Sequence, residues 1–96
     1  MTAYVIFINE GSLDGSEMQT YRSLVPSTLK DRPITMLSMH GRLEGLEGIM
    51  PESVTLASFP TMADAVSWFE SPAYQDAARH RHAGAAYRVL LLEGTD

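Results

Sequence analysis

The chain has 96 residues, of which 45% are hydrophobic and 20% are charged, a composition typical of an ordered globular protein. This length leaves room for one hydrophobic core, so we expect a single domain over residues 1–96. Acidic residues outnumber basic ones by 12 to 7, which gives a formal net charge of −5. Because nucleic acids and anionic membranes require clustered basic residues, neither is an expected partner.

The sequence contains no cysteine, which excludes disulfides, thiolate nucleophiles and cysteine-ligated metal centres. The apolar run Ala3–Ile8 is too short for the core of a signal peptide or for a membrane span. We therefore expect a cytoplasmic protein.

The first part of the chain predicts a strand followed by a helix. The run Ala3–Ile8 is rich in β-branched and aromatic residues, which favours a strand. Asp14, with Glu17 three residues later, is typical of a helix start with a capping box. Pro26 lies inside the helical pattern, so we expect it to kink the helix or to end its first segment near Val25.

The middle of the chain predicts two strands joined by a loop that contains Gly and Pro. The second strand is expected over Thr35–Leu43 and the third over Ser53–Phe59, where Pro60 stops it. Side chains alternate between the two sides of a strand. One side of the second strand would then carry Met36, Ser38, His40 and Arg42.

The last part predicts a helix in two segments and a fourth strand. Thr61 is expected to cap the first segment, with Asp64 as its capping-box partner. Ser71-Pro72 then restarts the helix, because serine is a good cap and proline suits the first helical position. The restarted helix should close by Gly84, and Tyr87–Leu92 should form the last strand.

The order β-α-β-β-α-β predicts an α+β fold of the ferredoxin-like type, a four-stranded antiparallel sheet with the helices on one face. The first and last strands carry apolar residues on both sides, so the face away from the helices should also be apolar. Because soluble monomers rarely expose such a patch, we expect a homodimer whose sheets pack together. In the alternative, these two strands are the central ones and loops shield the rest.

His40 is the sharpest candidate for chemistry, because an imidazole titrates near neutrality and commonly serves as a general base. In a pocket beside Tyr21 or Trp68 it could take a proton from an acidic carbon or a phenol. The alternative is a hydrogen-bonded strand histidine at a dimer interface. Arg42 could grip a carboxylate or an enolate, although such an arginine more often pairs with a nearby acid such as Glu44.

Other residues complete the candidate site. Residues 79–82 are basic and lie near the C-terminal end of the predicted helix, where positive charge stabilises the helix, so most of them need no functional explanation. Arg81 alone could turn inward. Aromatic side chains can wall a pocket or form plain core, and methionines suit either role. The candidate catalytic residues are His40, Tyr21 and Arg81, and the candidate substrate-binding residues are Trp68, Arg42, Ser38, Met36 and Asn9. Neither a metal-ligand spacing nor a nucleotide-binding motif occurs, so no metal or cofactor is expected.

Several segments resemble the domain of unknown function 1330 family. The most specific is Ala65-Val66-Ser67-Trp68-Phe69-Glu70-Ser71-Pro72-Ala73-Tyr74-Gln75. Weaker likenesses occur in Ala3–Phe7, Tyr21–Pro26, Leu46-Glu47-Gly48 before Pro51, Phe59-Pro60, Arg81 and Glu93-Gly94. The turn after the second strand departs from relatives, which often have Arg-Gly or Gly-Gly where this chain has His40-Gly41.

The resemblance covers nearly the whole chain and implies a ferredoxin-like fold that pairs into a dimeric α+β barrel. The superfamily includes cofactor-independent monooxygenases, polyketide cyclases and lactone isomerases, several of which use a pocket histidine or tyrosine. Other members have no known activity. No catalytic motif of the family carries over to named positions here.

Two functions remain open from the sequence. The first is a small cofactor-independent enzyme that acts on an aromatic or polyketide-like molecule by proton transfer, leading to cyclisation, isomerisation or oxygen insertion. His40 would be its base, and Tyr21 or Arg81 would steady the developing oxyanion. The second is a non-catalytic homodimer that binds a small molecule or a protein partner. Replacement of His40 by alanine should abolish turnover in the first case and leave ligand binding intact in the second.

Overall fold

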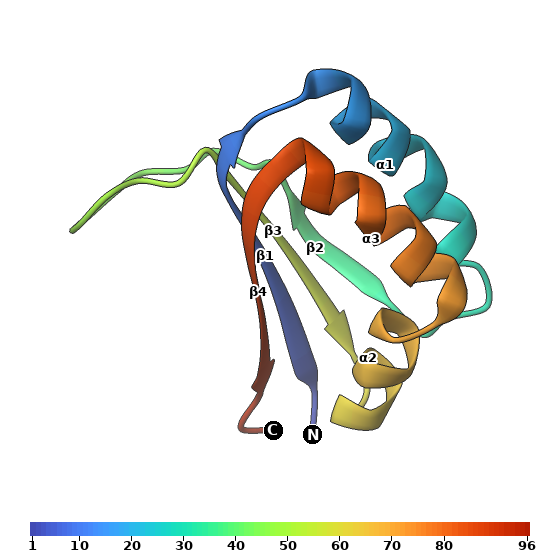
Figure 1. Ribbon diagram of the computed structural model, residues 1–96. Helices are drawn as coiled ribbons and strands as arrows, with labels where there is room; N and C mark the ends of the chain where they lie inside the picture. Colours follow the sequence, from blue (N-terminus) through green and yellow to red (C-terminus); the bar gives the residue numbers. More distant parts are fainter.

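A four-stranded antiparallel sheet with every helix on one of its faces forms the framework of the computed structural model, which describes residues 1–96 (Figure 1). The elements are β1 (Ala3–Ser12), α1 (Gly15–Thr28), β2 (Thr35–Met39), β3 (Ser53–Phe59), α2 (Met62–Phe69), α3 (Pro72–Gly84) and β4 (Ala85–Glu93). The strand order is β2-β3-β1-β4. The ferredoxin-like α+β fold predicted from the sequence is confirmed. No helix is long and apolar enough to cross a membrane.

Side-chain caps begin the three helices where the sequence predicts them. The carboxylate of Asp14 accepts two backbone N–H groups in the first turn of α1. The hydroxyl of Thr61 caps α2. The hydroxyl of Ser71 accepts the N–H of Tyr74 at 3.2 Å, and Pro72 is the first residue of α3. Each cap satisfies backbone donors that the helix itself leaves free.

Of the two outcomes expected at Pro26, a kink or an end near Val25, the end near Val25 is wrong. The helix passes through Pro26 and ends at Thr28. The N–H of Leu29 then donates to the carbonyl oxygen of Pro26 at 3.2 Å and closes the last turn. A proline removes one backbone hydrogen bond, and the loss matters less so close to a helix end than in the helix interior.

The hydrophobic core lies between the sheet and the helices. Ala3, Val5 and Phe7 of β1 alternate with half-buried residues and are themselves buried against the helices. The rings of Trp68 and Tyr74 meet at the α2–α3 junction with centroids 4.2 Å apart. Burying one large apolar side chain contributes roughly 1.5–3 kcal/mol, so this junction fixes the helices firmly over the sheet.

The opposite face of the sheet is also apolar, as predicted. Ile6 of β1 lies between Leu56 of β3 and Leu90 of β4 in the strand register, and it points away from the helices. Leu90 and Leu92 are 48% and 57% exposed. The alternative in which β1 and β4 are the two central strands is wrong, because β4 is an edge strand and β3 and β1 are central.

Strand β2 is shorter and less regular than predicted. It ends at Met39, four residues before the expected Leu43. A register shift between Met36 and Ser38 places Met36 opposite Ala57 but Ser38 opposite Leu56. Met36 therefore shares the helix-facing side of the sheet, whereas Ser38 lies on the other side. The expected common side for Met36, Ser38, His40 and Arg42 is wrong because this bulge breaks the alternation.

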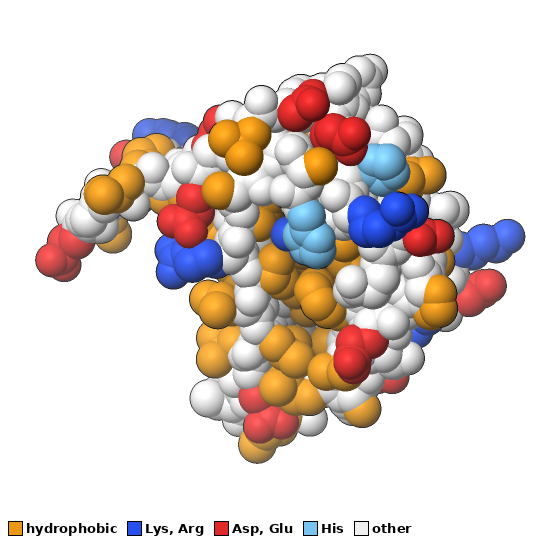
Figure 2. Space-filling view, viewed as in Figure 1, with side chains coloured by type: hydrophobic (Ala, Val, Ile, Leu, Met, Phe, Trp, Pro, Cys, Tyr) orange, Lys and Arg blue, Asp and Glu red, His pale blue; other side chains and the backbone are white.

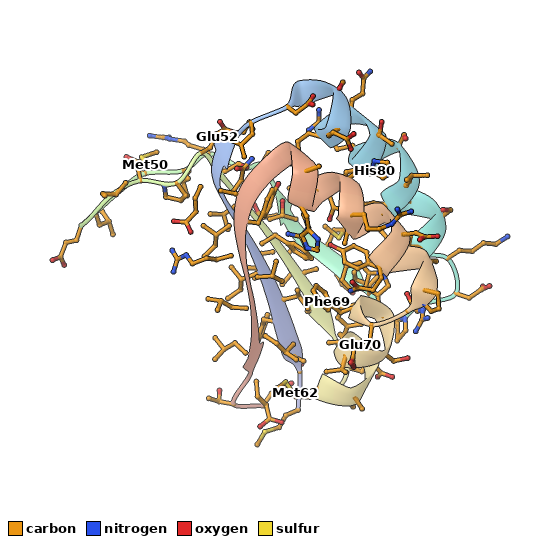
Figure 3. The ribbon with its side chains drawn as sticks, in the orientation of Figure 1. Met50, Glu52, Met62, Phe69, Glu70 and His80 are labelled. Carbon is orange, nitrogen blue, oxygen red and sulfur yellow. The ribbon has the colours of Figure 1, made fainter.

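Residues 40–52 leave the sheet and form an arm that extends well beyond it (Figure 1). Leu46 is 94% exposed and Ile49 is fully exposed. Met50 lies on the arm, away from the helices (Figure 3). The arm therefore presents apolar side chains that nothing in one copy of the chain covers.

Candidate functional site

A cavity of about 400 Å³ opens between α1, β2 and the helix-facing side of the sheet. Eleven of its fifteen lining residues are hydrophobic, which suits a ligand with an apolar body. Its apolar wall includes Phe7, Val25, Ile34, Met36, Met39 and Trp68. Tyr21 and Tyr87 are counted among the eleven and carry hydroxyl groups, and the polar or charged lining residues are His40, Arg22 and Thr55.

Tyr21 brings a hydroxyl group from α1 to this cavity. Its oxygen lies 2.7 Å from the hydroxyl oxygen of Tyr74, which is fully buried on α3. Burial raises the pKa of Tyr21 far above its usual range, and the neighbouring Tyr74 adds to this effect, while Arg81 opposes it. Tyr21 is therefore protonated at neutral pH, where it can donate a hydrogen bond to an oxyanion but cannot serve as a base.

Arg81 turns inward from α3 and is only 3% exposed. Its guanidinium carbon lies 5.9 Å from the ring centroids of Phe7 and Tyr21 and 5.1 Å from that of Tyr87. These three rings line the cavity, and Arg81 lies behind them. The positive charge therefore acts on the cavity wall from the interior of the protein.

His40 lines the cavity immediately after the end of β2, and it is exposed. The expected position in the middle of a strand is wrong. Its φ of 54° lies in the left-handed region, which is uncommon for residues other than glycine. The other two histidines have side-chain partners. His80, between α3 and α1 (Figure 3), lies 2.7 Å from Glu17, and His82 contacts Arg81. The imidazole of His40 has none, so it is free to meet a ligand at the mouth of the cavity.

Two of the predicted substrate-binding residues line the cavity. Met36 contributes from β2 and Trp68 from α2. Trp68 is 2% exposed, and its indole N–H donates to the hydroxyl of Thr28 at 3.2 Å. Trp68 is thus a core residue whose ring also forms part of the cavity wall. Its buried indole N–H has the hydrogen-bond partner that burial demands.

The other three predicted substrate-binding residues do not line it. Arg42 is on the arm and pairs with Glu44 at 3.3 Å, with both side chains largely exposed. Ser38 faces the side of the sheet away from the helices. Asn9 is buried, but its side chain donates to Glu52 and accepts from the N–H of Gly11, so it organises the irregular end of β1.

Sequence reasoning missed Tyr87 and Arg22. Tyr87 lies opposite Asn9 on β4, its hydroxyl has no partner in the chain, and burial raises its pKa while Arg81 lowers it. Tyr87 and Val89 are two residues apart in a strand, so the sequence could have indicated that both face the helices.

Arg22 precedes Val25 by three residues in a helix. That spacing places the two side chains on the same face of α1 and was the available signal for Arg22.

A second apolar groove of about 370 Å³ lies between α2 and β4. Val66, Phe69 and Leu90 contribute to it, and Glu70 is its one charged residue. Figure 2 shows hydrophobic side chains gathered over β4 and beside α2, and Figure 3 places Phe69 and Glu70 there. No group of three His, Asp or Glu side chains in the chain is arranged to hold a metal ion. The groups that can perform chemistry thus gather at the first cavity.

Comparison with known proteins identifies a family and a set of shared folds. The sequence model of the family described as Domain of unknown function (DUF1330) matches residues 2–95. No curated protein matches the chain. The solved structures described next are at most 15% identical in sequence to this chain, so their similarity shows a shared fold.

Three solved structures have folds similar to that of this chain. A protein of unknown function from Rhodopseudomonas palustris has a TM-score of 0.75 and 15% identity, over 99% of this chain and 83% of that one. A dimeric ferredoxin-like protein of unknown function from Jannaschia sp. CCS1 has a TM-score of 0.76 and 14% identity, over 98% of this chain and 100% of that one. SnoaB, a cofactor-independent oxygenase from Streptomyces nogalater, has a TM-score of 0.58 and 13% identity, over 99% of this chain and 92% of that one.

Proposed function

The chain belongs to the Domain of unknown function (DUF1330) family, and from its cavity we propose that it is a small cofactor-independent enzyme. It binds an aromatic or polyketide-like molecule and transfers a proton, with His40 as the base. The observation that carries this proposal is the cavity itself, in which His40 and the hydroxyl-bearing side chains of Tyr21 and Tyr87 meet a largely apolar wall. Perturbed titratable groups in an apolar pocket are typical of active sites.

In this mechanism the apolar wall holds the body of the substrate and excludes water. His40 takes a proton from an acidic carbon or a phenol at the cavity mouth, which leaves an enolate or a phenolate. The hydroxyl of Tyr21 donates to the new oxyanion, and its hydrogen bond with Tyr74 holds it in place. Cyclisation, isomerisation or reaction with oxygen then follows from that anion.

The positive charge of Arg81 supports this step without contact with the substrate. It lies behind the rings of Tyr21 and Tyr87 and lowers the pKa of each, against the effect of burial. A more acidic hydroxyl is a stronger hydrogen-bond donor to an oxyanion. Arg81 is therefore a positioning residue in this proposal. The description of SnoaB as a cofactor-independent oxygenase supports the proposal at the level of fold alone.

One observation favours a second candidate, a protein that binds a small molecule without turning it over. General bases are commonly oriented by a third group, and the imidazole of His40 has no such partner in the chain. In that case His40 only contributes to the rim of a binding site. The two candidates share the ligand and differ in what His40 does to it.

We also propose that the chain forms a homodimer through the face of the sheet away from the helices. Ile6, Leu90 and Leu92 lie on that face, and their burial against a second copy would remove a continuous apolar patch from water. The similar protein from Jannaschia is described as dimeric and ferredoxin-like. The exposed apolar residues of the arm, such as Leu46, give the second copy a further contact.

A titration tests ligand binding directly. The probe is 1-phenyl-1,3-butanedione, which has an aromatic body and an acidic carbon, added to uniformly nitrogen-15-labelled protein. Backbone resonances of cavity residues such as Met36 and Tyr21 should shift, while those beside the α2–β4 groove, such as Val66, should not. Shifts confined to the groove would contradict the assignment of the site. His40→Gln should retain binding in both candidates, so only loss of turnover in that variant separates them.

A further inference from the structure

We propose that the ligand of the cavity is an organic anion, an aromatic or polyketide-like molecule that carries a carboxylate. This inference rests on the proposed binding function and narrows its substrate class. It is argued from two cationic side chains, Arg22 in the cavity wall and Arg81 behind it, in a chain whose net charge as a whole is −5.

The first observation is the state of Arg81, a buried cation without a counter-ion. Its side chain forms no ion pair, and its Nε atom is buried with no hydrogen-bond partner. Its side-chain partners are neutral, since Nη2 lies 3.3 Å from Nε2 of His82 and the guanidinium also interacts with the hydroxyl of Tyr74. A buried charge is costly when it is unpaired, and the faces of three aromatic rings offset only part of that cost. An anion in the adjacent cavity would compensate the rest.

The second observation concerns the lining of the cavity. Arg22 contributes to the wall, and no Asp or Glu does. Two acids outside the wall have partners of their own, since Glu17 lies 2.7 Å from His80 and Glu52 accepts hydrogen bonds from Asn9 and Ser12. Glu52 still acts on Tyr87, whose pKa it raises, but its effect there is smaller than the opposing effect of Arg81.

Geometry sets the size of the expected effect. The guanidinium of Arg81 lies behind the rings of Phe7, Tyr21 and Tyr87, so a carboxylate against their other side lies roughly 9 Å from the charge. At an effective dielectric constant of about 20, Coulomb's law gives about a tenfold to twentyfold preference for an anion over a neutral isostere at that distance. Arg22 is exposed and adds a smaller, salt-sensitive share.

Paired probes test the inference, namely 2-naphthoate and its neutral amide, 2-naphthamide. Dissociation constants are measured on the full chain near neutral pH by the same backbone-resonance titration. We expect 2-naphthoate to bind about tenfold more tightly than 2-naphthamide. Added sodium chloride should reduce that preference only slightly, because the buried Arg81 is poorly screened.

Two variants identify the source of the preference. Arg81→Met keeps an apolar chain of similar shape and removes the charge, so it should abolish most of the preference, measured as the ratio of the two dissociation constants in that variant. Arg22→Gln changes an exposed residue and should reduce the preference by a factor of about two at low salt. If Arg81→Met fails to fold, Arg22→Gln still measures whether a positive charge at the cavity favours the anionic probe.

The outcomes separate this inference from the function on which it rests. If both probes bind equally, the anionic class is wrong and the proposed cavity stands. If the preference survives in both variants, the argument from Arg81 and Arg22 is overturned. If neither probe binds the cavity, the proposed ligand site fails, and the anionic class fails with it.

Discussion

The hydroxyl oxygens of Tyr21 and Tyr74 lie 2.7 Å apart and join α1 to α3 directly beside the cavity. Tyr74 is fully buried, whereas Tyr21 lines the cavity. The same hydrogen bond therefore stabilises the helix layer and orients a hydroxyl toward a ligand. Two variants that break it from opposite sides separate these roles.

Tyr21→Phe and Tyr74→Phe should each lower the free energy of unfolding by about 1 kcal/mol, because each leaves one hydroxyl without its partner. Tyr21→Phe removes the hydroxyl itself, whereas Tyr74→Phe removes only the partner that orients it, so Tyr21→Phe should slow proton transfer from a bound probe more than Tyr74→Phe does. Urea unfolding and probe turnover measured on both variants check this. Unchanged turnover in Tyr21→Phe would contradict the role of its hydroxyl.

The stability of the protein should fall as the pH drops from about 7 to about 5, in part because of His82. Burial, helped by the positive charge of Arg81, lowers the pKa of His82 below its usual value of 6.5. The unfolded chain then binds a proton at a higher pH than the folded chain, so acidification favours unfolding.

His82→Gln should make the free energy of unfolding less dependent on pH across that interval. Ala83→Gln is the matched control, because it adds the same side chain at a neighbouring exposed position and removes no titratable group. The measurement is urea unfolding at several pH values. A His82→Gln slope that equals the slope of the control would refute the prediction.

A charge on the face of the sheet away from the helices should break the proposed homodimer. Leu92→Glu places two like charges near each other in a symmetric interface and should yield a monomer in sedimentation velocity. Val66→Glu introduces the same charge on the helix side, at a residue that is 40% exposed, and should remain dimeric. A wild-type chain that sediments as a monomer at high concentration would overturn the proposal.

The restart of the helix at Ser71 should be worth about 1 kcal/mol. Ser71→Ala removes the acceptor for the N–H of Tyr74, and a lost N-cap typically costs that much. Ser23→Ala, at an exposed position within α1, should have little effect or stabilise slightly, since alanine has the higher helix propensity. Thermal unfolding of both variants checks the difference.

The helix starts and the apolar faces were predictable because their causes are local. Asp14, Thr61 and Ser71 each act on backbone groups within their own first turn, and the sequence shows all of them. The two apolar faces of the sheet follow from strand composition alone. The end of α1 was less predictable, because the free-energy cost of Pro26 within the helix depends on how many helical residues follow it.

The end of β2 was not predictable because it depends on a partner strand. Met39 pairs with Thr55, and the residues of β3 before it pair only with β1, so residues 40–43 have no strand beside them. The apolar pattern through Leu43 gave no sign of this. The regular alternation assumed there placed Ser38 and Arg42 in the site. The bulge turns Ser38 to the other side of the sheet, and the early end of β2 leaves Arg42 on the arm.

The candidate site itself was partly predictable. Tyr21, Trp68, Met36 and His40 line the cavity, and Arg81 lies behind it. Tyr87 was missed because a tyrosine in a strand has many roles, and only the packing of β4 against β1 brings it beside Arg81. The assignment of chemistry to these residues stays a prediction.

The most direct test of the proposed proton transfer is deuterium exchange at the acidic carbon of 1-phenyl-1,3-butanedione in heavy water, followed by proton NMR. The wild-type protein should accelerate exchange above the buffer rate, and His40→Gln should return it to the buffer rate while still binding the probe. Exchange that is equally fast with His40→Gln and with the wild-type protein would contradict the role of His40 as the base.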